Sequence, residues 1–155
     1  MRRVPVRVTT RLPDRPARVF EQVAAIDLTA IFKGWGPLPA VTGTRDQTGD
    51  WDHVGVSRAV LLADGSSARE ELVAYNPPHH FGYRLTFGGR FGAVVSDAAG
   101  TWWFKPAAGG GTEVEWTYAF APRPGAGLLV ELGLGPLWRR YAERVLAETM
   151  AQAQG

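Results

Sequence analysis

The stretch Thr112–Phe120 reads TEVEWTYAF, and a large apolar side chain stands at every second position from Val114 onward. This period of two predicts a half-buried β-strand. The large side chains on its apolar face (Val114, Trp116, Tyr118 and Phe120) need a second surface to cover them. From Pro136 to the end of the chain the period becomes helical, with one apolar stripe formed by Leu137, Tyr141, Val145, Leu146 and Met150. We expect this C-terminal helix to cover the apolar face of the strand.

The rest of the chain places two short helices and a run of strands before this pair of elements. Val4–Leu12 alternates like a strand, and helical spacing follows up to Ile26 and again over Leu28–Phe32. From Val41 to Pro122 about six strand patterns follow one another. This order is typical of an α+β domain in which helices cover one face of an antiparallel sheet. We expect a single domain over residues 1–155.

A glycine-rich stretch, Gly88–Gly100, interrupts the strand patterns. The sequence predicts a loop and a short strand there, with ends that the pattern does not fix. We expect the next strand to span Thr101–Phe104. The glycines of Gly88–Gly92 lack the lysine and hydroxyl residue of a phosphate-binding loop, and they predict a mobile turn that could gate an interior space.

Composition excludes several classes of function. The 155 residues are 45% hydrophobic and 21% charged and include no cysteine, which rules out disulfides and thiolate chemistry. No run reaches the ~18 apolar residues of a membrane span, and the first residues lack the apolar segment of a secretory signal, so we expect a cytoplasmic protein. The net charge is +2. The early arginines are spread over a strand, a turn and a helix start, and they predict a solvated surface rather than a nucleic-acid site.

The three histidines, His53, His79 and His80, do not have the spacing of a metal site. We therefore expect no metal and no other cofactor. His79 shares its strand parity with Tyr83, so it could reach the rim of an interior cavity, although a solvated histidine at the strand end is the simpler interpretation.

A possible ion pair lies in the hairpin around Ala63-Asp64-Gly65. If the loop has three residues, Arg58 lies opposite Glu70; if it has two, Arg58 lies opposite Glu71. The pair is either a structural ion pair or a polar anchor for a ligand carbonyl or carboxylate. Because a buried pair is a poor stabiliser, the second interpretation gains weight.

Several strings in this order resemble those of a known superfamily. They are Arg15–Phe20, Trp35-Gly-Pro37, Gly55–Arg58, Asp64-Gly65, Glu70, Tyr75–Pro78, Tyr83 and Gly111–Trp116. The set is similar to that of the START/birch-pollen-allergen-like (SRPBCC) superfamily, and most closely to its polyketide cyclase/dehydrase-like branch. The resemblance implies a helix-grip fold: a curved antiparallel β-sheet wrapped around a long C-terminal α-helix, with two short helices after the first strand. It also implies a cavity between sheet and helix.

The expected cavity has the usual volume of ~300–1,000 Å³, with Arg58, Glu70 and Tyr83 among its lining residues. Trp35, flanked by glycines and a proline, is expected in a loop at its mouth. The full set of predicted ligand-binding residues is Trp35, Arg58, Glu70, Leu72, Tyr83, Phe87, Trp102, Trp116 and Tyr118.

Three functions fit this sequence. The first is binding of a small hydrophobic or aromatic ligand, a lipid or a polyketide-like compound. The second is a cyclase or dehydratase acting on such a ligand, with Arg58, Glu70, Tyr83 or His79 orienting it or transferring a proton. The third is a protein-interaction module with a filled core. No acid–base pair is placed by the sequence, which favours binding over catalysis, and the oligomeric state stays open.

Overall fold

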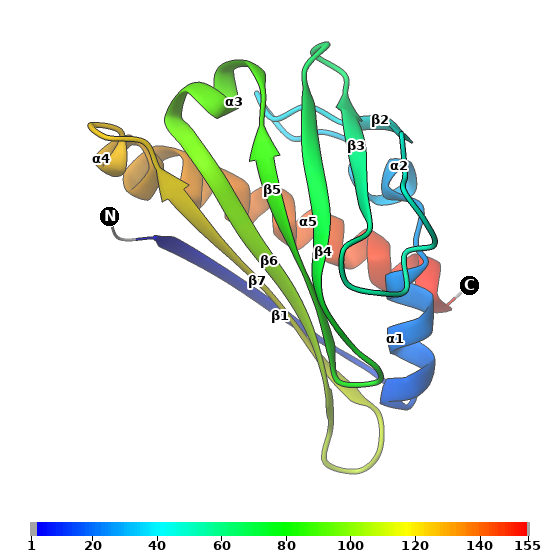
Figure 1. Ribbon diagram of the computed structural model, residues 1–155. Helices are drawn as coiled ribbons and strands as arrows, with labels where there is room; N and C mark the ends of the chain where they lie inside the picture. Colours follow the sequence, from blue (N-terminus) through cyan, green and yellow to red (C-terminus); the bar gives the residue numbers. More distant parts are fainter. Residues whose placement is uncertain (1–2, 155) are drawn as a thin grey trace.

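The computed structural model describes residues 3–154, which form one curved antiparallel sheet around a long helix (Figure 1). Within that part of the chain the sheet has seven strands in the order β1-β7-β6-β5-β4-β3-β2. The strands are β1 Val4–Leu12, β2 Val41–Arg45, β3 Ser57–Leu62, β4 Ser67–Asn76, β5 His80–Phe87, β6 Val95–Pro106 and β7 Thr112–Pro122. The α+β helix-grip architecture expected from the sequence is confirmed.

Helices lie between β1 and β2, between β5 and β6, and after β7. They are α1 Pro16–Ala24, α2 Leu28–Ile31, α3 Gly89–Val94, α4 Gly127–Leu129 and α5 Gly135–Gln154, with a π-helical turn, Val130–Leu134, before α5. Asp27 starts α2 by accepting a hydrogen bond on Oδ1 from the Thr29 amide at 2.9 Å. α4 and the π-helical turn lie before the predicted start of the C-terminal helix. No helix within residues 3–154 has both the length and the apolar character needed to cross a membrane.

The prediction for the glycine-rich stretch was wrong in two respects. Gly89–Val94 forms helix α3, and β6 begins at Val95 instead of Thr101. A Cβ on Gly92 would lie 2.2 Å from the Phe87 carbonyl oxygen, so only glycine allows this helix to fold back so tightly on the end of β5. The first half of β6 is rich in alanine and glycine, and these small residues hide its alternation.

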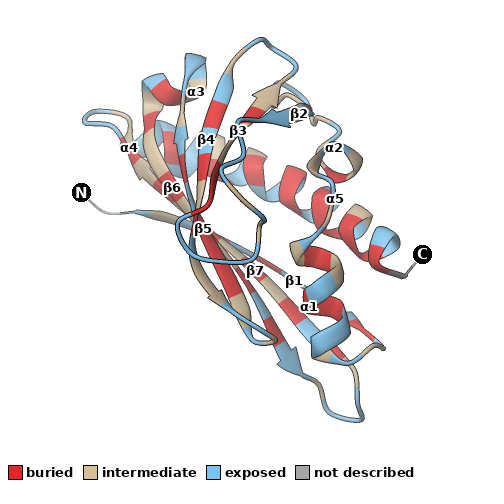
Figure 2. Ribbon diagram, turned by 45° about the vertical axis from the view of Figure 1, so that its right-hand side comes forward, coloured by how far each residue is buried: buried red, intermediate tan, exposed pale blue. Residues whose placement is uncertain are grey.

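The core lies between the concave face of the sheet and α5. Figure 2 shows buried residues alternating along the strands and forming a stripe along α5. On α5 the stripe consists of Trp138, Tyr141, Ala142, Val145, Leu146, Thr149, Met150 and Ala153. Tyr141 also ties α5 to the segment after α2, because its hydroxyl donates to the Pro39 carbonyl at 3.0 Å and accepts from the Gly34 amide at 3.0 Å.

The two edges of the sheet differ in length. The edge strand β2 has only five residues. The nine-residue β1 has Pro5, which has no amide hydrogen to offer, and its Arg7 carbonyl accepts a hydrogen bond at 2.8 Å from Arg139 of α5.

We predict that Leu146→Ala lowers the free energy of unfolding by about 2–5 kcal/mol, because it leaves a cavity between α5 and the sheet. Val145→Ala should cost somewhat less because it removes less volume. The exposed Arg140→Ala is the control on the same helix and should stay within about 0.5 kcal/mol of wild type. Urea denaturation measures all three, and equal effects for Leu146 and Arg140 would contradict the packing described.

Candidate functional site

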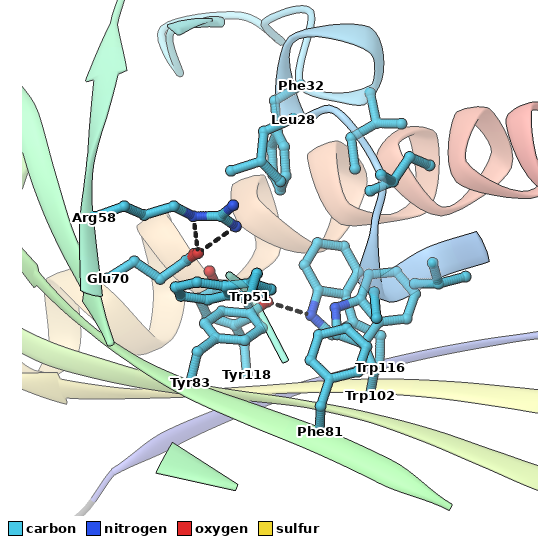
Figure 3. Close-up of a pocket in the computed structure, with 14 residues that line it drawn as sticks. Leu28, Phe32, Trp51, Arg58, Glu70, Phe81, Tyr83, Trp102, Trp116 and Tyr118 are labelled. Carbon is cyan, nitrogen blue, oxygen red and sulfur yellow. Dashed lines mark hydrogen bonds and ion pairs between the residues drawn. The ribbon is translucent and has the colours of Figure 1, made fainter. Parts of the chain in front are cut away.

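A partly enclosed cavity lies between the concave face of the sheet and the α1–α2 region, and Figure 3 shows the side chains around it. Its volume is about 40 Å³, room for a few water molecules. The lining residues are Val23, Ala24, Ile26, Leu28, Ile31, Phe32, Trp51, Arg58, Glu70, Phe81, Tyr83, Trp102, Trp116 and Tyr118. Two larger hollows, of about 550 and 430 Å³, are open grooves on the surface between β1 and α5. The partly enclosed cavity is the better candidate site because aromatic and charged groups converge on it.

Arg58 and Glu70 face each other across β3 and β4. The ladder pairs Arg58 with Glu70 and Ser57 with Glu71, which decides between the two registers left open by the sequence. Arg58 donates from Nε at 2.9 Å and from Nη2 at 2.6 Å, and both bonds reach the same carboxylate oxygen, Oε1. The side chains are only 12% and 8% exposed. Within residues 3–154, no hydrogen bond engages the two N–H groups of Arg58 Nη1 or the Oε2 atom of Glu70. Neither atom is fully buried, so both face accessible space.

The Arg58–Glu70 pair places one positive and one negative charge at the cavity, which together give it no net charge. Burial raises the pKa of the Glu70 carboxyl above its ordinary value, although the charge and the hydrogen bonds of Arg58 act in the opposite direction. Arg58 and Glu70 are the only charged residues among those lining the cavity. Their opposite charges sum to zero, so the cavity has no net charge but presents the hydrogen-bonding groups of one ion pair within an apolar lining.

Trp51 covers Arg58 from the loop between β2 and β3. The guanidinium carbon lies 3.9 Å from the centroid of the indole ring, a close cation–π contact. Trp51 is not among the predicted site residues because its neighbours, Asp50 and Asp52, indicate a solvated loop. A lone tryptophan in such a polar loop is the signal that could have identified it.

Tyr83 lies flat on the sheet because its partner on β6 is a glycine. The ladder pairs Tyr83 with Gly100, and a Cβ on Gly100 would lie 2.6 Å from the tyrosine ring. In this position the Tyr83 hydroxyl oxygen accepts a hydrogen bond of 2.9 Å from Trp116 Nε1. Burial raises the pKa of Tyr83 far above its ordinary value, so the hydroxyl stays protonated and neutral.

Stacked aromatic rings form one wall of the cavity. Trp102 and Trp116 stack with centroids 4.6 Å apart and planes 12° apart. Tyr118 meets Trp116 edge to face at 5.5 Å. A planar ligand can stack on such flat rings, whose mutual angles are fixed, in addition to being buried among them.

The structure brings six of the nine predicted residues to this cavity: Arg58, Glu70, Tyr83, Trp102, Trp116 and Tyr118. The other three do not line it. Leu72 is fully buried in the core, Phe87 packs against Phe91 of α3 at 4.4 Å, and Trp35 stacks on Arg144 of α5 at 4.1 Å. His79 is exposed at the end of the β4–β5 turn.

The expected cavity size was wrong. A volume of about 40 Å³ is far below the ~300–1,000 Å³ of ordinary ligand pockets. Two rings that the sequence did not assign to the site, Phe32 and Trp51, occupy part of the space. Phe32 packs against Trp116, Trp138 and Tyr141, and so joins the wall of the cavity to the core under α5.

Comparison with known proteins connects almost the whole chain to one protein family. A family model described as "Polyketide cyclase / dehydrase and lipid transport" matches residues 3–154. No curated protein matches the chain.

Solved structures with the same fold share little sequence with this chain. The crystal structure of Ara h 8.0201 is 16% identical with a TM-score of 0.73, and 98% of each chain is covered. A protein from Nitrosospira multiformis is 20% identical with a TM-score of 0.66, covering 96% of this chain and 94% of that one. The di-domain ARO/CYC BexL from the BE-7585A biosynthetic pathway is 16% identical with a TM-score of 0.66, covering 99% of this chain and 50% of that one.

We predict that Gly100→Ala forces the Tyr83 ring off the sheet and breaks its hydrogen bond with Trp116, at a cost of about 1–3 kcal/mol. In a Tyr83→Leu background the same substitution should cost much less, since the clashing ring is gone. Gly43→Ala is the matched control, because a Cβ there meets nothing within 4 Å. Urea denaturation of the four variants gives the coupling, and additive effects would argue against the described contact.

Proposed function

Because the chain belongs to the polyketide cyclase/dehydrase and lipid transport family, we propose that it binds a neutral, largely apolar small molecule and holds the molecule's one polar end with Arg58 and Glu70. The family description names cyclases, dehydrases and lipid transport, all of which handle mainly apolar molecules. The binding role of the predicted residues at the cavity is part of this proposal.

The observation that carries the proposal is the incomplete pairing of Arg58 with Glu70. Both donated hydrogen bonds reach Oε1, so Nη1 and Oε2 are left without partners among residues 3–154. Burial of an ion pair costs free energy because both charges lose their water. The cost is offset only when the remaining donors and acceptors of the pair also form hydrogen bonds. A ligand hydroxyl could satisfy both, because it donates one hydrogen bond and accepts another.

The charge balance of the cavity argues for a neutral ligand. A ligand carboxylate would add a second negative charge beside Glu70, and only one cation lines the cavity to offset both. A ligand ammonium would meet the same difficulty beside Arg58. The seven aromatic side chains of the lining set (Phe32, Trp51, Phe81, Tyr83, Trp102, Trp116 and Tyr118) favour a flat, unsaturated body.

A second candidate is proton-transfer catalysis of the cyclase or dehydratase type. It is favoured by the burial of Glu70, which raises the pKa of its carboxyl above the ordinary value, since a raised carboxyl pKa is suited to general acid–base work. The name of the BexL neighbour fits the same class. Of the four residues considered from the sequence, Arg58, Glu70 and Tyr83 lie at the cavity, whereas His79 is exposed.

A third candidate is an interaction module. The small cavity volume favours it, and so do three leucines of the α4 region, Leu128, Leu129 and Leu132, which are more than half exposed. The experiment below separates it from the first candidate, because an interaction module has no reason to bind the probes.

We predict that wild-type protein binds 2-naphthol about tenfold more tightly than naphthalene, the effect of one net hydrogen bond of roughly 1.4 kcal/mol. The paired substitution of Arg58→Met and Glu70→Leu should keep the fold and abolish the preference, because apolar residues of similar volume replace the ion pair. Arg58→Ala alone should instead destabilise the fold by about 3–5 kcal/mol, since Glu70 loses its partner.

Fluorescence titration measures the two affinities, and urea denaturation checks the fold of each variant. If the doubly substituted protein retains the preference for 2-naphthol, the ion pair is structural and its proposed role in binding is wrong. Absence of binding to either probe by any variant would leave the interaction module as the better candidate.

A further inference from the structure

The loop between β2 and β3 has a short tip that is fixed at both ends. The Thr48 amide donates to the Ser57 carbonyl at 3.0 Å, and the Ser57 amide donates to Thr48 Oγ1 at 3.0 Å. The Gly55 amide donates to the Leu72 carbonyl of β4 at 2.9 Å. These bonds hold the loop to the sheet and leave a tip, residues 49–54, which begins with Gly49 and is followed by Gly55.

Trp51 is the one large side chain of the tip that reaches inward. Asp50, Asp52, His53 and Val54 are exposed, whereas Trp51 is half-buried and lines the cavity. Its close contact is the Arg58 guanidinium at 3.9 Å (Figure 3). The indole thus lies on the polar group that the proposed function assigns to the ligand.

We propose that Trp51 is a built-in competitor of the ligand: its indole takes the place over Arg58 that the flat ring of a ligand occupies, and binding displaces residues 49–54. This inference rests on the proposed function and adds the residue that selects the ligand. It assigns the site to neutral molecules with a planar aromatic ring, because such a ring restores the cation–π contact that the departing indole gives up.

The cavity volume requires some lining group to move. About 40 Å³ cannot hold a bicyclic aromatic molecule, so a ligand of that size enters only when the enclosure opens. Most lining residues belong to strands or to helices packed on them. Phe32, the other ring that fills the space, contacts three aromatic rings of the core.

Trp51 packs against the edge of the hydrophobic core, but it is held less than the other aromatic rings that line the cavity. Within residues 3–154 no ring–ring contact of Trp51 is found, and its backbone lies in the tip rather than in a strand. Gly55, at the end of the tip, has a φ of +101°, a conformation that glycine adopts freely. In the open state that the proposal requires, the tip swings out while the ion pair, the aromatic wall and the sheet stay in place.

Competition of this kind lowers apparent affinity. When a closed state dominates, the apparent affinity is the intrinsic affinity multiplied by the fraction of open molecules. Removing the indole removes the competitor and should raise affinity, which is the opposite of what loss of an ordinary lining residue would do.

The test compares Trp51→Ala with Trp103→Ala by isothermal titration calorimetry with 2-naphthol. Trp103 is the matched control: it is a partly exposed tryptophan whose ring lies 4.5 Å from that of His80, and it does not line the cavity. We expect Trp51→Ala to bind 2-naphthol about two- to thirtyfold more tightly than wild type, the range set by one cation–π contact. Trp103→Ala should bind with unchanged affinity.

A second measurement uses intact wild-type sequence labelled with 5-fluorotryptophan. The ¹⁹F resonance of Trp51, assigned by its loss in Trp51→Phe, should move toward the position of a solvent-exposed indole when 2-naphthol is added. This readout does not depend on the stability of the alanine variant.

The outcomes separate the two proposals. If wild type binds 2-naphthol while Trp51→Ala binds it equally or more weakly and the Trp51 resonance stays in place, the competitor role is overturned and the proposed function stands. If neither wild type nor Trp51→Ala binds 2-naphthol, the proposed function itself fails. Binding by Trp51→Ala but not by wild type would support the competitor role in its strongest form.

Discussion

Trp116 is the residue at which the core and the candidate site meet. It is 2% exposed, and its ring contacts those of Phe32 from the α2 region, Trp102 from β6 and Trp138 from α5. Its one polar atom bonds to Tyr83 in the cavity wall. One indole therefore contacts the sheet, the α2 region and the long helix α5. A shift of α5 on the sheet would move Trp116 and with it the wall of the cavity.

The spacing of apolar residues and the length of a turn could predict individual strands, helices and hairpins from the sequence. The strand around Trp116 and the helix that covers it follow from alternation, and the hairpin loop limits the partner of Arg58 to Glu70 or Glu71, between which the ladder then decides. The volume of the cavity does not follow from such rules, because it depends on how side chains from several elements meet. Trp51 shows why: nothing in its polar neighbourhood indicates that its ring turns inward onto Arg58.

Acids on the outer face of the sheet have more basic partners than Glu70 has in the cavity. Asp97 is shared by Arg3 at 2.8 Å and Arg84 at 3.1 Å, and Glu115 is shared by Arg7 and Lys105. The hydrogen bond from Arg7, helped by Lys105, lowers the pKa of Glu115 to about 2 despite partial burial. On the outer face, each of these two acids thus has two basic partners that lower its pKa and keep it ionised. In the cavity, by contrast, one acid and one base balance each other within an apolar lining.

The edges of the sheet determine how the molecule behaves in a crowded solution. An unpaired strand edge is a template on which another chain can add a strand, and long flat edges lead to aggregates. Here the longer edge, β1, carries a proline and has its Arg7 carbonyl occupied by Arg139, and the other edge, β2, has five residues. The loop beside β2 can therefore open and close without exposing a long strand edge on which a neighbouring molecule could pair its own strand.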